Sequence, residues 1–259
     1  IDVIAKKQRL GIEGLRAISS SKDIGVTELG FRIGPRINAA GRTGASDLGF
    51  RLLTSQSDDE VMAISERLNN LNQQRQNIEQ TVLFEATNII EEELASKKLN
   101  SIPNSIVVNG EGWHLGVLGI VASRLKEKYY RPSFVVSTND GISTGSARSV
   151  SGIDVGELII DAVNRGILNS GGGHKMAGGF SLDSSRFEEF KEFCEKKIFD
   201  KADESTLKKI NLYDDIIDSS IINRDLYDLI KLASPYGQGN PEPQFIRKNA
   251  KIDYWSEVG

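Results

Sequence analysis

Residues Asn169 to Gly179 read N-S-G-G-G-H-K-M-A-G-G, with five glycines in the last nine positions. Glycines 171 to 173 carry no side chain, so another molecule can approach their backbone closely. His174 can donate or accept a hydrogen bond near neutral pH, and Lys175 adds a positive charge. The stretch is therefore suited to hold a phosphate or a nucleobase edge. A glycine-rich hairpin with a surface histidine is the alternative interpretation.

Strands and helices alternate around this stretch, between residues 101 and 203. Apolar patterning predicts helices at 116–129, 155–165 and 185–198, and strands at 105–109, 134–137, 144–150 and 179–182. This order predicts an α/β domain with a mixed sheet, of a size typical of one folding unit. The single cysteine, Cys194, shares an apolar helical face with Phe187, Phe190 and Ile198, so we interpret it as a core residue.

A long helix is expected before this domain, over residues 57–98. Ser57 and Glu60 fit a capping box, and apolar residues then recur at helical spacing from Val61 to Ile89. No glycine or proline interrupts the stretch, which at about 1.5 Å per residue is roughly 60 Å long. Such a helix usually connects two bodies. The apolar stripe loses heptad regularity after Leu71, which disfavours a coiled coil.

Phe31 to Arg42 read F-R-I-G-P-R-I-N-A-A-G-R, a second unusual stretch. Pro35 is unfavourable inside a helix, and the glycines permit a tight backbone. Asn38 could hold a loop or a ligand. Guanidinium groups suited to bidentate phosphate contacts come from Arg32, Arg36 and Arg42. The alternative is a loop whose arginines fix a domain junction.

The last segment is shorter and less regular. Its pattern predicts a strand at 213–217, a helix at 223–233, a proline- and glycine-rich loop at 234–245 and a strand at 251–255. A single strand cannot complete a sheet, so we expect this edge to pair with something further.

Composition is that of a soluble globular protein, with 39% hydrophobic and 26% charged residues in a chain of 259. No apolar run could span a bilayer and no signal-peptide pattern is visible, so we expect a cytoplasmic protein without membrane contact. The net charge of -4 argues against coating of nucleic acid by bulk electrostatics. Residues 1–42, however, carry eight Lys and Arg against four Asp and Glu, which suits a local phosphate contact.

Common catalytic motifs are absent from the sequence: no H-E-x-x-H, C-x-x-C, G-x-S-x-G, phosphate-loop or dinucleotide-binding pattern occurs. The two histidines have no aspartate cluster at metal-ligand spacing, so we predict neither a metal ligand nor a catalytic residue. What remains is a set of groups that can hold an anion. These candidate nucleic-acid-binding residues are Arg36, Asn38, Arg42, His114, Arg148, Ser149, Gly172, Gly173, His174 and Lys175.

Six motifs in order make a family resemblance visible. They are L-G-F-R-I-G-P-R-I-N-A-A-G-R, L-N-N-L-N-Q-Q-R-Q-N-I-E-Q, W-H-L-G-V-L-G-I-V-A-S-R-L-K-E-K-Y-Y-R-P, G-S-A-R-S, G-G-G-H-K-M-A-G-G and P-Y-G-Q-G-N-P-E-P-Q-F. Together they resemble the RecJ family of bacterial single-strand-specific 5′ to 3′ DNA exonucleases, in the DHH phosphoesterase superfamily. The glycine motif alone would indicate only the DHH-associated domain of that superfamily.

The resemblance implies a nuclease whose N-terminal DHH domain binds Mn²⁺ or Mg²⁺ through aspartates and a histidine pair. This chain has no D-H-H triplet, so we expect those ligands to lie outside it. On the family layout, residues 1–57 are the tail of the DHH domain and 58–100 the long connecting helix. Residues 101–203 are then the DHH-associated α/β domain, and 204–259 the start of an oligonucleotide-binding (OB-like) barrel.

The function implied is that of part of an exonuclease in DNA recombination and repair, in which this portion positions the strand for metal-dependent phosphodiester hydrolysis. Arg36, Arg42, Arg148 and His174 would contact DNA phosphates or the terminal nucleotide. Bases could stack on Trp113, unless this residue is core. Single-stranded DNA is the expected partner, single-strand-binding protein a candidate one, and the expected state a monomer.

Two alternatives remain open. The chain could be a stand-alone module that binds single strands or a protein and never cuts. It could instead be a phosphodiesterase for short RNA or cyclic dinucleotides, although this does not explain the barrel-like end. We predict that this chain alone does not hydrolyse DNA with manganese.

Overall fold

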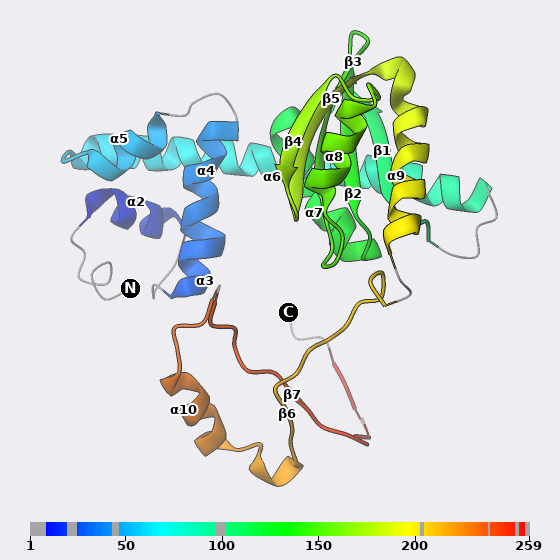
Figure 1. The fold of residues 1–259 in the computed structure, drawn as a ribbon. Coiled ribbons are helices and arrows are strands. Elements are labelled where there is room, and N and C mark those ends of the chain that lie inside the picture. The colour runs from blue at the N-terminus through cyan, green and yellow to red at the C-terminus, as the bar shows by residue number, and fades with distance from the viewer. Residues whose placement is uncertain are drawn as a thin grey trace. The chain divides into compact units, whose positions relative to one another are not determined.

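The computed structural model describes residues 9–19, 25–42, 47–96, 102–202, 205–237, 239–251 and 254–256 (Figure 1). The chain forms two compact units. The large unit is Arg36–Lys209, and the small unit combines Ile1–Pro35 with Ile210–Gly259. Among the described residues, no helix has both the length and the apolar composition that crossing a bilayer requires.

A five-stranded mixed sheet is the centre of the large unit (Figure 1). Its order is β1-β2-β3-β5-β4; only β1 and β2 are parallel, and the other neighbours are antiparallel. The mixed α/β prediction is therefore confirmed. The strands are β1 (Ile106–Glu111), β2 (Ser133–Asn139), β3 (Ile142–Arg148), β4 (Ser170–His174) and β5 (Ala177–Asp183).

Helices cover both faces of this sheet. On one face lie α7 (Leu115–Tyr129) and part of α6 (Asp58–Ser96), where Val108, Val121 and Val82 share a core. On the other lie α8 (Val155–Asn164) and α9 (Phe187–Lys201), which follows the short helix η2 (Ser184–Arg186). Cys194 is fully buried in this second core, which confirms its interpretation as a core residue, and burial raises the pKa of its thiol.

The glycine stretch itself forms β4, which the apolar pattern did not predict as a strand. Gly171 and Gly178 lie beneath α8, where a Cβ on Gly171 would come within 2.6 Å of Ile159 and one on Gly178 would overlap the same side chain. The close approach of α8 to the sheet is therefore one reason for the glycines. No residue from 170 to 179 has a positive φ, so unusual backbone freedom is not the reason.

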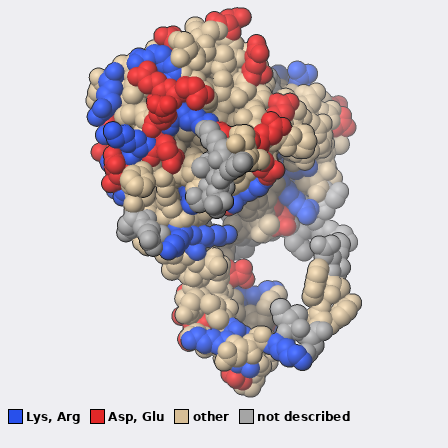
Figure 2. Space-filling model, turned by 90° about the vertical axis from the view of Figure 1, so that its right-hand side faces the viewer, with Lys and Arg blue, Asp and Glu red and all other residues tan. Residues whose placement is uncertain are grey.

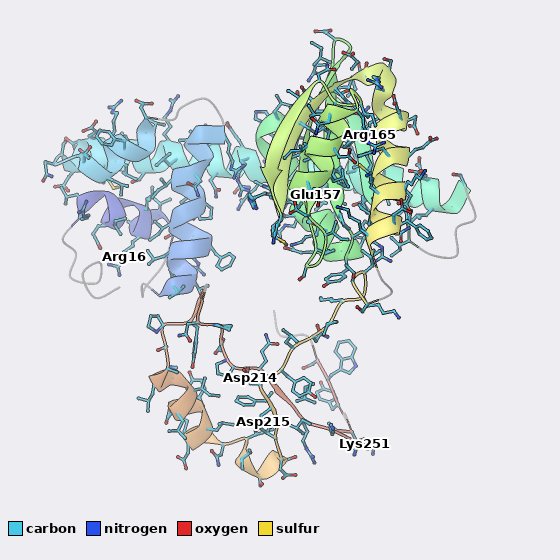
Figure 3. The ribbon with its side chains drawn as sticks, viewed as in Figure 1. Arg16, Glu157, Arg165, Asp214, Asp215 and Lys251 are labelled. Atoms are coloured by element: carbon cyan, nitrogen blue, oxygen red, sulfur yellow. The ribbon has the colours of Figure 1, made fainter. Side chains whose placement is uncertain are left out.

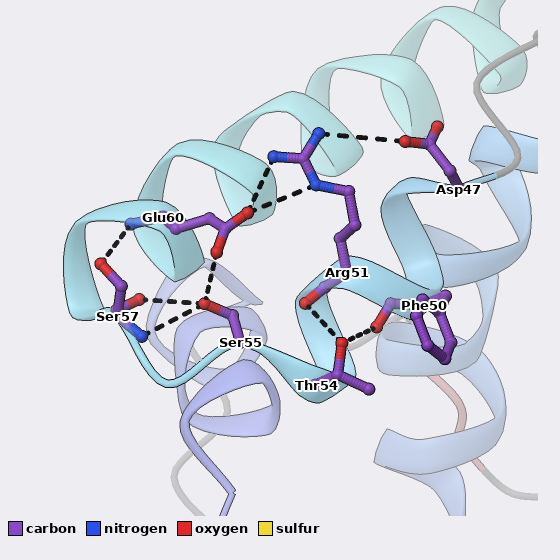
Figure 4. Close-up of polar contacts among 7 residues, drawn as sticks. All are labelled: Asp47, Phe50, Arg51, Thr54, Ser55, Ser57 and Glu60. Carbon is purple, nitrogen blue, oxygen red and sulfur yellow. Dashed lines mark hydrogen bonds and ion pairs between the residues drawn. The ribbon is translucent and has the colours of Figure 1, made fainter.

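The long helix α6 is confirmed and spans 39 residues. Its start differs from the predicted capping box (Figure 4). Ser57 Oγ accepts from the backbone N–H of Glu60 at 3.4 Å, but the Glu60 carboxylate turns to Ser55 Oγ and Arg51, both at 2.8 Å. These two partners hold the pKa of Glu60 below its ordinary value. Arg51 belongs to α5 (Leu48–Thr54), so the carboxylate joins α5 to α6.

The Phe31–Arg42 stretch is helical, which corrects the expectation that Pro35 opposes a helix there. A π-helix, η1 (Leu29–Ile33), precedes α4 (Gly34–Arg42), and Gly34 N–H donates to Leu29 O. Helix α3 (Val26–Glu28), η1 and α4 follow one another without a break, so Pro35 lies inside a continuous helical run that widens to a π-turn directly before it. The π-turn supplies an i→i+5 bond just before the proline. A further helix, α2 (Leu10–Ser19), lies upstream.

The C-terminal part of the small unit has little regular structure. Strands β6 (Asp215–Ile216) and β7 (Phe245–Ile246) form a parallel pair. Between them lie η3 (Ser219–Ile221) and α10 (Arg224–Leu232), whose first turn is capped by the side chain of Asn223. The predicted strand at 213–217 and helix at 223–233 are confirmed in shortened form. The predicted strand at 251–255 is not seen at Lys251 or at 254–255, and residues 252–253 lie outside the described part.

Candidate nucleic-acid interface

One row of residues crosses the sheet at its end: Arg148 of β3 pairs with Ala177 of β5, which pairs with His174 of β4. Residues in register point to the same face of a sheet. Ala147 belongs to the core under α8, so Arg148, Ala177 and His174 point to the α7 face. The Cα atoms of Arg148 and His174 are thus about two strand spacings, or ~10 Å, apart.

Arg148 packs against the second turn of α7. Its Nη2 would lie 2.7 Å from a Cβ on Gly119, and its Nη1 donates to its neighbour Ala147 O at 2.8 Å. Burial lowers the pKa of the Arg148 guanidinium, and the positive charge of Arg42 lowers it further. The helix glycine therefore makes room for a partly buried arginine beside a second positive charge.

Arg42, the last residue of α4, reaches the start of α7. Its Nη1 donates to Gly116 O at 2.9 Å. His114 is the N-cap of α7, and its Nδ1 accepts from Gly116 N–H at 3.0 Å. Around one end of α7 therefore lie two guanidinium groups and one imidazole. Their residues were all candidates from the sequence, although they are far apart along the chain. We call Arg42, His114 and Arg148 the anion cluster, together with His174, which shares the sheet row of Arg148.

The turn between β4 and β5 is held on both sides. Met176 N–H donates to His174 Nδ1 at 3.3 Å, and Met176 O accepts from Ser149 N–H at 3.0 Å. Lys175 O accepts from Val155 N–H at the start of α8, at 3.2 Å, while the Lys175 side chain is exposed. Ser149 is buried and its hydroxyl donates to Ile153 O at 2.7 Å. Through its backbone N–H, Ser149 therefore helps to hold the β4–β5 turn in place.

The two glycines of the candidate set differ in their surroundings. A Cβ on Gly173 would overlap the β5 backbone at Ala177 and Gly178, so this glycine permits close strand pairing. A Cβ on Gly172 would meet nothing within 4 Å. Gly172 points to the α7 face, as His174 does, because alternate residues of a strand share a face. Its backbone is therefore open to a ligand beside the anion cluster.

Small residues fill the rest of this face of β4 and β5. We call them the glycine shelf: Ser170, Gly172, Ala177, Gly179 and Ser181. The hydroxyls of Ser170 and Ser181 lie 2.8 Å apart, in hydrogen-bond contact. Sequence reasoning missed the two serines. Ser170 lies two residues before Gly172 and Ser181 two residues after Gly179, so in strands they share a face with these glycines. The shelf offers a flat surface next to two arginines.

Arg36 and Asn38 are placed differently. Arg36 Nε donates to Asn69 Oδ1 of α6 at 2.9 Å, so this arginine joins α4 to α6. Asn38 is exposed on α4. Trp113 is buried under α6 and α7 with its Nε1 donating to Glu85 at 2.7 Å, so it is a core residue and offers no stacking face to a base.

The α8 face carries charged side chains, among them Glu157 and Arg165 (Figure 3). Glu157 binds Lys201 at 2.8 Å, and Arg165 binds Asp161 at 2.9 Å. The view in Figure 2 shows basic and acidic side chains interspersed, without a continuous basic surface. The net charge of -4 likewise disfavours bulk attraction of a polyanion. Across the residues that the structure describes, no three His, Cys, Asp or Glu side chains gather to hold a metal ion, so these residues do not fit a Mn²⁺ or Mg²⁺ centre.

Comparison with known proteins shows which family this chain resembles. Residues 102–199 match the model of the DHHA1 domain, and residues 213–259 match the model of the RecJ OB domain. The chain is a RecJ-like portion. The single-stranded-DNA-specific exonuclease RecJ of Haemophilus influenzae is 34% identical over 246 residues, which are 93% of this chain and 42% of that protein. RecJ of Thermus thermophilus is 34% identical over 237 residues, 90% of this chain and 33% of that protein.

Solved RecJ structures agree. The crystal structure of Thermus thermophilus RecJ in complex with Mn²⁺ matches with a TM-score of 0.78 and 31% identity, covering 93% of this chain and 34% of that one. A manganese-bound exonuclease RecJ matches with a TM-score of 0.61 and 32% identity, over 73% of this chain and 45% of that one. The family resemblance is confirmed, and the chain spans less than half the length of these RecJ relatives.

Proposed function

We propose that this chain is part of a single-stranded-DNA-specific 5′ to 3′ exonuclease, and that its anion cluster holds a phosphate of the DNA strand. The observation that carries the proposal is that Arg42 donates to Gly116 O and Arg148 packs against Gly119, so that both guanidinium groups lie at the first two turns of α7. Burial lowers the pKa of Arg148, and the positive charge of Arg42 lowers it further. Two guanidinium groups that repel one another are stabilised by an anion between them. A DNA phosphate supplies that anion, and the similarity to RecJ exonucleases supports this choice.

The glycine shelf extends the proposed site along the strand. Its side chains are small and two of them are hydroxyls, so a nucleotide next to the bound phosphate can lie against the sheet without steric conflict. Backbone and hydroxyl groups of this kind position a strand without reading its sequence. We therefore expect sequence-tolerant binding.

The wider assignments are proposals of the same kind. We propose that the intact protein uses Mn²⁺ or Mg²⁺, as in the solved RecJ complexes, and acts in DNA recombination and repair as a cytoplasmic monomer. We also propose the division into residues 1–57, 58–100, 101–203 and 204–259, and the two domain matches support the last two segments. Single-strand-binding protein remains a candidate partner.

Fluorescence anisotropy with a 5′-phosphorylated single-stranded oligonucleotide tests the proposal. Replacing Arg148 by Gln removes one charge-assisted contact, worth about 1.5 to 3 kcal/mol, so affinity should fall about tenfold or more. Arg165→Gln is the matched control, because Arg165 pairs with Asp161 on the other face. Equal affinity of wild type and Arg148→Gln, or an equal loss in both variants, would contradict the assignment of the phosphate to this cluster.

A further inference from the structure

Strand β1 forms one edge of the sheet, with β2 as its neighbour on one side. Ile106 N–H donates to Pro132 O, on the β2 side of the strand. Backbone groups of a strand point alternately to its two sides. The N–H and C=O groups of Val107 and Asn109 therefore point away from β2, and none of the residues that the structure describes is hydrogen-bonded to them. An unpaired edge of this kind is a template for a further strand.

Glu195 of α9 occupies the start of this edge. Its carboxylate accepts from the backbone N–H groups of Asn104 and Ser105, both at 2.9 Å. Ser105 lies two residues before Val107, so the N–H groups of both point to the open side. The Glu195 carboxylate thus takes the place that a carbonyl of an added strand would have. An added strand would therefore pair with β1 from Val107 onward.

A groove of about 810 Å³ lies beside the start of β1, between the end of α6 and helix α9. Its α6 wall is apolar and consists of Ile90 and Leu94. Phe199 of α9 also lines the groove, although 69% of its surface is exposed to solvent. The groove therefore offers apolar contacts next to the open strand edge.

The α9 wall of the groove is acidic. Glu188 and Glu192 lie one turn apart on α9, and both are exposed. Lys191 is paired with Glu93 of α6 at 2.5 Å, so its charge is already compensated. In all, four glutamates and two lysines line the groove. This excess of negative charge favours a ligand with cationic side chains.

The two walls lie on opposite faces of the sheet, because α6 packs in the core with Val108 and α9 in the core with Val107. Alternate side chains of an added strand would point to these two faces in turn. We propose that β1 binds an extended segment of a partner protein as a further strand, with apolar side chains toward α6 and lysine or arginine side chains toward α9. Backbone hydrogen bonds to Val107 and Asn109 supply affinity, and the alternation of apolar and basic side chains supplies specificity.

This surface is separate from the anion cluster. β1 and β4 are the two opposite edges of the sheet, and the proposed peptide site lies at the edge that does not carry the glycine shelf. The inference therefore does not depend on the proposed DNA contact, and each can fail without the other.

A fluorescein-labelled peptide of alternating valine and lysine, somewhat longer than β1, tests the binding by fluorescence anisotropy with the 259-residue chain. We expect saturable binding with a Kd of about 10 to 100 μM. A peptide of alternating valine and glutamate should bind at least about tenfold more weakly. No saturable binding of the valine–lysine peptide up to about 1 mM, or equal binding of both peptides, overturns the proposal.

Charge reversal on α9 locates the peptide. Glu192→Lys should weaken binding of the valine–lysine peptide about fivefold to tenfold. Glu189→Lys is the matched control, because Glu189 belongs to the same helix but pairs with Arg186 and does not line the groove. It should bind within about twofold of wild type. An equal loss in both variants would mean that only the overall charge of α9 matters, which contradicts binding in the groove.

Amide hydrogen exchange, followed by ¹H–¹⁵N NMR, tests the added strand itself. Saturating peptide should slow exchange about tenfold or more at Val107 and Asn109, but not at Val108, whose N–H already faces β2. Unchanged exchange at Val107 and Asn109 overturns strand addition. Sedimentation of the free chain tests the other occupant, a second copy. A dimer that the peptide dissociates would assign the β1 edge to self-association and contradict a partner protein.

Discussion

Arg148 and His174 flank Ala177 in one row across three strands and point to the same face of the sheet. Their positions depend on strand register, because a shift of one residue would turn either side chain to the opposite face. Arg42 enters from α4 and His114 from the start of α7. The proposed phosphate site thus depends on the packing of α7 against the sheet, and its residues can be tested through their neighbours.

Gly119→Ala should separate stability from binding. Alanine replaces glycine inside α7, which should raise the free energy of unfolding by up to about 1 kcal/mol. Its Cβ, however, would lie 2.7 Å from Arg148 Nη2, so the guanidinium must move. We expect an equal or higher melting temperature together with weaker oligonucleotide binding by anisotropy. Unchanged binding in a folded variant would show that the position of Arg148 is unimportant.

Two glycine substitutions on opposite faces of the β4–β5 pair form a second test. Gly178→Ala introduces overlap with Ile159, so it should lower the free energy of unfolding by about 1 to 3 kcal/mol. Ile159→Val in the same chain removes the conflicting methyl group and should recover part of the loss. Urea unfolding measures both, and equal stability of Gly178→Ala and wild type would contradict the packing of α8.

Gly172→Ala is the matched substitution on the shelf. A Cβ there meets nothing within 4 Å, so urea unfolding should show a stability close to that of wild type. If a nucleotide lies against the shelf, the added methyl group should weaken oligonucleotide binding several-fold. Wild-type affinity in this variant would indicate that the strand does not touch Gly172.

A substitution of Glu79 tests the ion pairs that this residue makes within α6 and with α7. Its carboxylate accepts from Arg75 at 2.7 Å and contacts Arg124 at 3.4 Å, and Glu79 and Arg75 are both nearly buried. Glu79→Ala leaves Arg75 without its main partner, so we expect a loss of about 3 kcal/mol in the free energy of unfolding. Glu91→Ala, which removes an exposed pair with Lys128, should cost less than about 1 kcal/mol. Similar losses in both variants would contradict the difference in burial.

The sequence predicted regular elements well where one periodicity dominates. The 39-residue helix α6 and the helices around the sheet carry clear apolar stripes. β4 was missed because S-G-G-G-H has no apolar alternation, and its strand form depends on pairing with β5 and on the approach of α8. Pro35 suggested a break, but the chain stays helical through it, with a π-turn directly before the proline. Residue types alone do not show that the neighbouring backbone can accommodate a proline in this way.

Most of the candidate site could be predicted from residue chemistry, but its grouping could not. Arg42, His114 and Arg148 were recognised as anion-binding types, and the fold brings them around one end of α7. Arg36 has the same chemistry but donates to Asn69, a contact 33 positions away that no local pattern reveals. Ser149 belongs to the same candidate set, but it is buried and its hydroxyl donates to Ile153 O.

A double-mutant cycle on Arg42 and Arg148 tests the central claim most directly. Oligonucleotide affinity is measured for wild type, Arg42→Gln, Arg148→Gln and the double variant at one salt concentration. If both guanidinium groups bind the same phosphate, the losses are non-additive, with an interaction energy of about 1 kcal/mol or more. Losses that add within about 0.5 kcal/mol would mean that the two arginines bind separate groups, and the anion cluster would not be one site.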